Sequence, residues 1–261
     1  MKVCTLASSS SGNCTIVSYC NMNLLIDAGI SLRRIREGLR LAGLTPDDLN
    51  GVFVTHAHSD HINGIRMLIK HHKTPVFSSY DTGVGICQAF PEAAPYISSF
   101  ETGAEFEFGG ISVRSFSTPH DVSGSVGYTL QAGGKKLAYV TDLGQVTEEV
   151  MGAVQGAHLA VIEANHDPDM LKSGPYPQFL KRRILSDRGH LANGDSGSFA
   201  ARLAASGSRY ILLAHLSREN NTPCLARDTV QHALREEGIG IQKDVELDVA
   251  PPYSMSRVYI L

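Results

Sequence analysis

The stretch that decides the fold occupies residues 52–61 and reads Val52-Phe53-Val54-Thr55-His56-Ala57-His58-Ser59-Asp60-His61. Its β-branched and aromatic beginning predicts a buried strand, and the polar residues follow where that strand should leave its sheet. Alternation along an extended chain directs His56 and His58 to one side. Asp60 and His61, past a turn, can then face a second ion. Imidazole and carboxylate are ligands that zinc, manganese and iron accept, so this spacing predicts a metal site, whereas a lone histidine is more often structural.

Length and composition indicate one large globular domain over residues 1–261. Of these residues, 43% are hydrophobic and 19% are charged, which is enough apolar material for a sizeable core. The net charge of -3 gives no general attraction to nucleic acid or anionic membrane, so any polyanion must bind a local patch. The five cysteines contain no C-x-x-C pair, which argues against a disulfide framework and favours a reducing cytoplasm. The apolar run at the N-terminus is too short for a signal peptide, and no segment predicts a membrane span.

Periodicity and turn residues predict alternating strands and helices. We expect strands over residues 2–6, 15–19, 23–27, 52–54, 76–77, 105–108, 111–117, 125–131, 135–140, 158–162, 210–214, 244–249 and 257–260. We expect helices over residues 32–42, 62–73, 82–90, 146–155, 195–205 and 223–236. Gly109-Gly110 and Gly133-Gly134 are predicted hairpin turns. The link over residues 8–13 is a plain hairpin turn or, alternatively, a loop whose amides meet an anionic substrate.

Four further strands end on residues that could ligate or orient a metal. Asp27, His120, Asp142 and His215 each follow an apolar run, although each could also be a turn or capping residue. The resulting candidates are His56, His58 and His120 for one ion, Asp60, His61 and His215 for the other, and Asp142 between them. Two metals about 3.5 to 4 Å apart lower the pKa of a bridging water and clamp both oxygens of an in-line displacement, which suits phosphate-ester hydrolysis. Asp27 is a candidate acceptor that orients a histidine ligand.

Two other groups of residues are candidates for acid catalysis and phosphate binding. Protonation of the leaving oxygen needs a further acid, and His190 and His166 are of the right type. The most basic region is residues 172–191, which include Lys181 and Arg182 and could meet a phosphate backbone. Arginines at 33, 34, 36 and 40 indicate a solvated helix face more readily than a nucleic-acid patch.

The motifs resemble those of the metallo-β-lactamase superfamily, which match at Asp27, residues 56–61, His120, Asp142 and His215. This resemblance implies an α/β fold, the four-layer αββα sandwich, with the site at one edge of two sheets. Asp142 stands where the zinc β-lactamases carry a cysteine, which disfavours antibiotic hydrolysis. The chain also lacks the long insertion expected of the β-CASP nucleases.

Segments 163–167, 174–177, 180–184, 189–193 and 215–221 look like the YycJ/WalJ (VicX) subgroup of that superfamily. The subgroup implies 5′-to-3′ exonuclease activity on DNA. Two positions depart from its pattern, because Ser9 and Ala192 stand where we expect glycine and serine. We assign catalysis to His190 and Asp60 and expect substrate contacts from a further set of residues: Asn165, His166, Lys181, Arg182 and Asn193.

The leading hypothesis is a phosphodiesterase with two divalent ions, zinc, manganese or iron, that acts on DNA. A second hypothesis is a hydrolase of small or cyclic phosphodiesters, thioesters or lactones, which the overall acidity favours because a small substrate needs no basic groove. A third is a non-catalytic metal-binding scaffold.

Overall fold

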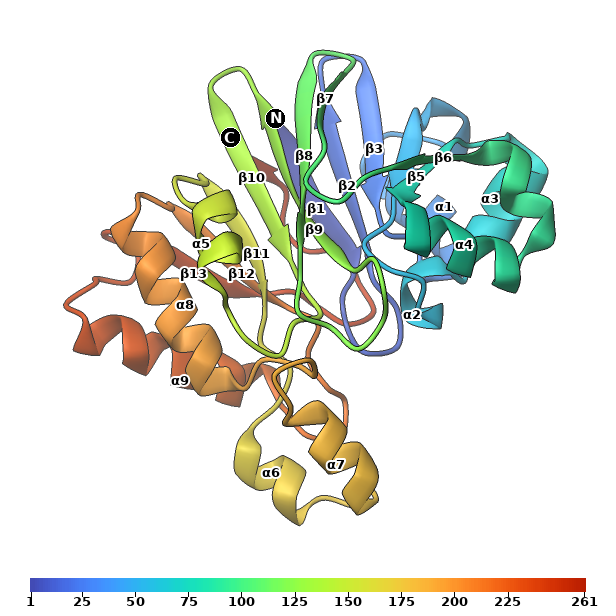
Figure 1. The fold of residues 1–261 in the computed structure, drawn as a ribbon. Helices are drawn as coiled ribbons and strands as arrows, with labels where there is room; N and C mark the ends of the chain where they lie inside the picture. Colours follow the sequence, from blue (N-terminus) through green and yellow to red (C-terminus); the bar gives the residue numbers. More distant parts are fainter.

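The chain builds two mixed sheets, the first from residues 2–100 together with the C-terminal strand and the second from residues 105–249, as Figure 1 shows for the computed structural model, which describes residues 1–261. In the first sheet the strand order is β14-β1-β2-β3-β4-β5-β6, and in the second it is β13-β12-β11-β10-β9-β8-β7. The strands of the first sheet are β1 (Lys2–Ala7), β2 (Cys14–Tyr19), β3 (Met22–Ile26), β4 (Gly51–Phe53), β5 (Val76–Ser79), β6 (Ile97–Phe100) and β14 (Tyr259–Ile260). Those of the second are β7 (Glu105–Phe108), β8 (Ile111–Ser117), β9 (Val126–Ala132), β10 (Lys135–Val140), β11 (Leu159–Glu163), β12 (Tyr210–Ala214) and β13 (Glu246–Val249).

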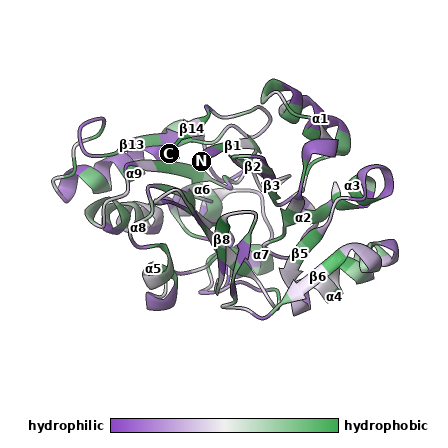
Figure 2. Cartoon of the chain, turned by 90° about the horizontal axis from the view of Figure 1, so that it is seen from above, coloured by the Kyte–Doolittle hydropathy of each residue, from purple (hydrophilic) through white to green (hydrophobic).

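Helices cover the outer face of each sheet. Seen from above, α1, α3 and α4 lie on one side of the two sheets, and α5, α8 and α9 lie on the other (Figure 2). The helices are α1 (Leu32–Leu41), α2 (Ser59–Ile62), α3 (Ile65–His72), α4 (Tyr80–Ala89), α5 (Glu148–Val154), α6 (Pro168–Ser173), α7 (Gln178–Ile184), α8 (Asn193–Ala205) and α9 (Pro223–Glu236), with 3-10 turns η1 (Pro46–Asp48) and η2 (Pro91–Tyr96). This is the predicted four-layer αββα sandwich. None of the helices has both the length and the apolar character that a membrane span requires.

The two sheets meet through a layer of aromatic side chains. Phe53 of β4 lies edge-on to Tyr128 of β9, with 5.7 Å between ring centroids, and is stacked on Phe106 of β7 at 6.0 Å. The Tyr128 hydroxyl donates a hydrogen bond of 2.7 Å to the Val54 carbonyl, so its polar tip is satisfied inside the core. Neighbouring Val52 points the other way, into the core beneath α1 and α3. Because β4 is buried on both faces, it reads as a continuous apolar run.

Glycines account for two predicted turns that the structure confirms and for one predicted helix that it divides. Gly109, Gly110, Gly133 and Gly134 all have positive φ values between 57° and 83°, so both predicted two-glycine hairpins are confirmed. The helix expected over residues 62–73 is divided into α2 and α3 near Gly64, whose amide bonds the Ala28 carbonyl at 2.7 Å. A Cβ at this glycine would overlap the Ile30 carbonyl oxygen, so close packing on the β3–α1 loop interrupts the helix. Strand β6 and helices α6 and α7 were not predicted.

Candidate metal centre

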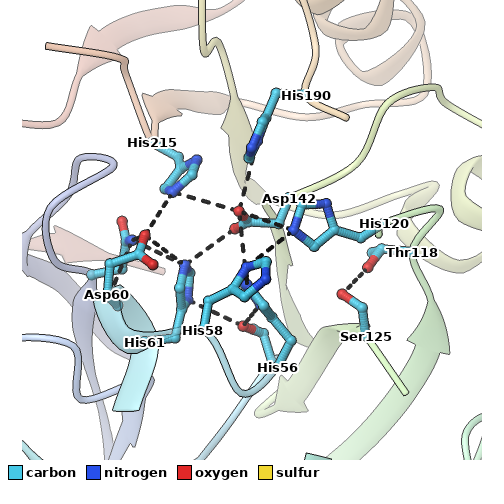
Figure 3. Close-up of polar contacts among 12 residues, drawn as sticks. His56, His58, Asp60, His61, Thr118, His120, Ser125, Asp142, His190 and His215 are labelled. Carbon is cyan, nitrogen blue, oxygen red and sulfur yellow. Dashed lines mark hydrogen bonds and ion pairs between the residues drawn. The ribbon is translucent and has the colours of Figure 1, made fainter. Parts of the chain in front are cut away.

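The predicted metal ligands converge from both sheets on one edge of the sandwich. Residues 56–61 follow β4 of the first sheet, while His120, Asp142 and His215 follow β8, β10 and β12 of the second. Parallel strands that end at the same edge bring their following residues together. Figure 3 shows Asp142 in the middle of the histidines, whose rings point inward.

Three of these strand-end residues adopt a left-handed backbone conformation that side chains rarely take. The φ values are 59° for Asp27, 61° for Asp142 and 56° for His215, and each residue lies one or two positions past its strand. Such residues carry a conformational cost of about 1–3 kcal/mol and persist where the surrounding structure enforces them. The turn directs each side chain into the cluster instead of along the strand, which makes these three positions the most constrained of the site.

His56, His58 and His120 form the first group of donors. The Nε2 atom of His56 lies 2.9 Å from Nδ1 of His58, and Nε2 of His120 lies 3.4 Å from that same Nδ1. Nitrogen atoms of three imidazoles therefore approach one another, and Asp121 Oδ1 lies 3.3 Å from Nε2 of His120 and 3.8 Å from Nε2 of His58. All three ligand atoms lie within 4.8 Å of one another, which is the arrangement of donors around a single cation.

Asp60, His61 and His215 form the second group. Asp60 Oδ2 lies 3.4 Å from His61 Nε2 and 3.3 Å from His215 Nε2. These atoms also lie within 4.8 Å of one another. The two groups use different faces of the same His-x-His-x-Asp-His segment, as predicted from the turn after His58, which here begins helix α2.

Asp142 lies within reach of both groups. Its Oδ1 is 4.0 Å from His56 Nε2 and 3.5 Å from His215 Nε2, and its Oδ2 is 3.4 Å from His61 Nε2. The carboxylate is buried, yet Oδ2 accepts no hydrogen bond. A buried carboxylate oxygen without a donor is costly unless a cation satisfies it. This orphaned atom, at the centre of five imidazoles and a second carboxylate, fits divalent metal ions.

Outer partners hold most of the ligand rings by the nitrogen that faces away from the cluster. Nδ1 of His61 lies 2.8 Å from Asp27 Oδ2, which places Asp27 in the predicted orienting position. Nδ1 of His56 lies 3.0 Å from the Thr55 hydroxyl, and Nδ1 of His120 lies 3.2 Å from the Gly189 carbonyl. Such partners fix the ring and leave Nε2 for the metal, and only His58 turns Nδ1 inward.

Glu163, at the end of β11, is a site residue that sequence reasoning missed. Its Oε1 lies 2.8 Å from Nδ1 of both His190 and His215, and its Oε2 accepts the backbone amides of Leu143 and Leu191. It therefore connects a metal ligand to the candidate acid. The signal was present, because this carboxylate ends a buried strand as Asp27 and Asp142 do.

Charges inside the cluster shift several pKa values in opposite directions. Burial lowers the pKa of His56 well below the usual range, and nearby imidazoles lower it further. Burial alone would also lower the pKa of His61, but Asp27 and Asp142 raise it well above normal. Burial alone would raise the pKa of Glu163, but the charge of His190 and hydrogen bonds from His190 and His215 lower it. The Glu163 carboxylate therefore remains ionised beside these two histidines, whereas burial raises the pKa of Asp27.

The two predicted acid candidates occupy different environments. His190 is 17% exposed at its side chain and is held through Nδ1 by Glu163. His166 is buried, and neither of its ring nitrogens has a hydrogen-bond partner. Burial lowers the pKa of His166 to about 4, so its ring is neutral near pH 7. The geometry favours His190 as the proton donor.

The remaining expected substrate contacts are placed unevenly. Asn165 donates to the His215 carbonyl at 2.9 Å, and Asn193 donates to Asn221 at 3.0 Å. Both side-chain amides are therefore used in hydrogen bonds within the protein. Lys181 differs from the expected phosphate contact, because it is buried and its ammonium donates to the Lys172 carbonyl at 2.6 Å, closing the end of α6. Arg182, the next residue of α7, is exposed and belongs to no ion pair, whereas Arg183 pairs with Asp121.

Comparison with known proteins places this geometry in a family. The Beta-lactamase superfamily domain matches residues 22–216. The chain is 36% identical to "Exodeoxyribonuclease YycJ" of Bacillus anthracis, over 97% of this chain and 96% of that one. It is 34% identical to "Exodeoxyribonuclease WalJ" of Streptococcus pneumoniae, over 96% and 94%.

Solved structures agree on the fold. The metallo-β-lactamase fold protein YhfI of Bacillus subtilis superposes with a TM-score of 0.74 at 16% identity, covering 99% of this chain and 98% of that one. Zinc-bound PqqB of Methylobacterium extorquens gives 0.72 at 23% identity, with both chains fully covered. The family match and the two relatives show that the chain belongs to the beta-lactamase superfamily, the solved structures show that it has the metallo-β-lactamase fold, and with its convergent His and Asp donors it is a metal-dependent hydrolase.

Proposed function

We propose that the protein is a two-metal phosphodiesterase that removes nucleotides from the 5′ end of DNA. The observation that carries this proposal is the pair of donor groups around Asp142, completed by the imidazole of His190 on Glu163, a carboxylate that it shares with His215. The names of the two relatives, which match over nearly the whole chain, support DNA as the substrate. The direction of attack, from the 5′ end, rests on the resemblance of the sequence to the YycJ/WalJ subgroup.

The residues fit two divalent ions, zinc or manganese before iron. One would be held by His56, His58 and His120, the other by Asp60, His61 and His215, with Asp142 shared. Bound there, such ions supply Lewis acidity toward the phosphate oxygens and lower the pKa of a coordinated water.

Two side chains, Asp60 and His190, orient the attacking water and protonate the leaving oxygen. Burial alone would raise the pKa of Asp60, but His61 and His215 hold it below its usual range, so the carboxylate stays ionised. Asp60 can therefore orient the attacking water as a hydrogen-bond acceptor. Glu163 fixes Nδ1 of His190 and leaves Nε2 to donate a proton to the leaving oxygen.

Two further features agree with an intracellular nuclease. All five cysteines are free thiols, which fits the reducing cytoplasm predicted for this chain. Arg182 and Arg188 are exposed on the segment that leads to His190, and Nε of Arg188 donates to the His120 carbonyl at 2.9 Å. We propose that these two arginines contact backbone phosphates near the leaving group.

The test is cleavage of a DNA duplex labelled at either the 5′ or the 3′ end, with manganese or zinc added. The proposal expects early release of mononucleotide from the 5′ label, full loss with chelator, and loss in His58→Ala. Asp228→Ala, on the exposed face of α9, serves as the matched control.

Two outcomes would overturn the proposal in different ways. A metallated protein that hydrolyses simple or cyclic phosphodiesters but neither DNA nor RNA would show a small-molecule hydrolase. Early release from the 3′ label would reverse the polarity while keeping the phosphodiesterase.

A further inference from the structure

A cavity of about 240 Å³ lies beside the candidate metal centre and is not used by the proposed chemistry. Its floor includes Ser8, Leu216 and Ser217, and its rim includes Arg218, Pro252 and Tyr253. Pockets that enclose drug-sized ligands are usually about 300–1,000 Å³. This one is therefore of a size for a single nucleoside.

The floor of this pocket is continuous with the metal centre. Leu216 directly follows the ligand His215, and the hydroxyl of Ser8 accepts a hydrogen bond of 2.8 Å from the His215 amide. The backbone amide of Ser217 donates a hydrogen bond of 2.8 Å to the Asn165 carbonyl. The pocket is therefore lined by the segment that directly follows this metal ligand.

Two arginines from distant segments lie against Tyr253, which lines the pocket together with one of them, Arg218. The guanidinium carbon of Arg34, in α1, lies 5.7 Å from the ring centroid of Tyr253, and that of Arg218 lies 5.5 Å from the same centroid. Nη2 of Arg34 also donates to the Pro252 carbonyl at 3.5 Å. Cation–π contacts of this kind position a guanidinium but leave its charge intact.

Neither guanidinium has a carboxylate partner, although Arg183, Arg202 and Arg257 elsewhere in the chain do. The neighbouring Glu219 forms no ion pair with Arg218. Two like charges brought to one aromatic ring repel each other unless an anion lies between them. Tyr253, an aromatic side chain 54% exposed, adds a face against which a base can pack.

We propose that this pocket binds the nucleotide next to the scissile phosphodiester, with its phosphate on Arg34 and Arg218 and its nucleoside against Tyr253. This inference rests on the proposed function, since it takes the ligand to be a nucleic-acid strand. Arg34 is here a substrate-binding residue, whereas the spacing of the arginines at 33, 34, 36 and 40 indicated a solvated helix face.

The test measures binding of a short fluorescein-labelled oligothymidylate, with phosphorothioate linkages that resist cleavage, to the metal-loaded enzyme. Arg34→Gln and Arg218→Gln should each weaken binding roughly 10-fold, as expected for loss of one charge-assisted hydrogen bond. Each should also reduce the slope of log affinity against log salt by about 0.7, the contribution of one phosphate on a single strand. Tyr253→Leu should weaken binding without changing that slope. Arg40→Gln, exposed on the same helix, is the matched control.

Three results would overturn the inference. Binding by Arg34→Gln and Arg218→Gln that equals binding by the control would do so and leave the proposed function standing. Weakened binding that appears only with a lower melting temperature would show a structural arginine pair. A wild-type enzyme that binds no oligonucleotide would remove both proposals, whereas one that binds through these arginines but does not cleave DNA would remove only the proposed function.

Discussion

Glu163 Oε1 lies 2.8 Å from Nδ1 of His190. The same oxygen lies 2.8 Å from Nδ1 of the ligand His215, so one carboxylate orients both a metal ligand and the candidate acid. Its other oxygen is occupied by the Leu143 and Leu191 amides, which prevents rotation of the group. The position of the acid is therefore coupled to the position of the metal site.

Replacement of His190 should slow cleavage most for substrates whose leaving oxygen must be protonated. A sugar oxygen must be protonated as it leaves, whereas p-nitrophenolate leaves readily as an anion. We expect His190→Ala to lower kcat on DNA by about 10²–10⁴, the usual range for general acid catalysis. The same variant should lose much less rate on bis(p-nitrophenyl) phosphate. Steady-state kinetics on the two substrates measures this difference.

An equal loss on both substrates would mean that His190 acts on the metal site and not on the leaving oxygen. His232→Ala is the matched control, because this histidine is exposed on α9 and pairs only with Glu236. It should leave both rates unchanged.

Metal content should distinguish the two donor groups. We expect two ions per chain in the wild-type protein and about one in Asp60→Ala, because Asp60 belongs to the second group only. Inductively coupled plasma mass spectrometry after dialysis gives the ratio. A ratio of two in Asp60→Ala would remove this residue from the ligands, and Asp228→Ala should keep the wild-type ratio.

Gly29 should be intolerant of even one added carbon. A Cβ there would overlap the backbone carbonyl of Asp60, which also accepts the Asn13 amide at 2.8 Å. We expect Gly29→Ala to destabilise the protein by about 1–3 kcal/mol, as overpacking does, and to lower metal occupancy. Thermal unfolding followed by circular dichroism measures the first effect.

Gly152→Ala provides the contrast for that substitution. This glycine lies in α5, with no atom within 4 Å of an added Cβ, so alanine should stabilise the helix by about 0.5–1 kcal/mol. If both substitutions changed the melting temperature by the same amount, close packing at Gly29 would not be the cause.

The cysteines should divide into two reactivity classes. Burial raises the pKa of the Cys4 and Cys14 thiols, while Cys20 and Cys224 are exposed. At pH 8 we expect iodoacetamide to modify the exposed pair quickly and the buried pair only after denaturation, because the thiolate is the nucleophile. Peptide mass spectrometry identifies the modified sites. Since the folded state holds these two protons more tightly, their contribution to stability should be lost as the pH rises above 9.0, the ordinary thiol value.

Much of the architecture could be predicted because its signals are local. The strand over 210–214 and the helix over 223–236 have the predicted bounds, since apolar periodicity and a Thr222 cap with Pro223 mark them. The strand that precedes His56 is equally clear. Each of these elements is specified by its own residues.

The rest depends on contacts between distant residues. Helices α6 and α7 are short and depend on the Asp167 cap and the Lys181 contact with the Lys172 carbonyl, which periodicity does not reveal. Glu163 was overlooked because its partners, at positions 190 and 215, are far along the chain. Lys181 was assigned to the surface by its charge, although the fold uses its ammonium internally.

The division of the chain between two sheets has a consequence for assembly. Residues 56–61 follow a strand of the first sheet, whereas His120, Asp142 and His215 follow strands of the second, and the chain crosses to the second sheet after β6 and returns to the first at β14. Fragments separated at that crossing would each hold only part of the donor set. Metal retention is therefore a measure of how well the two sheets are packed together.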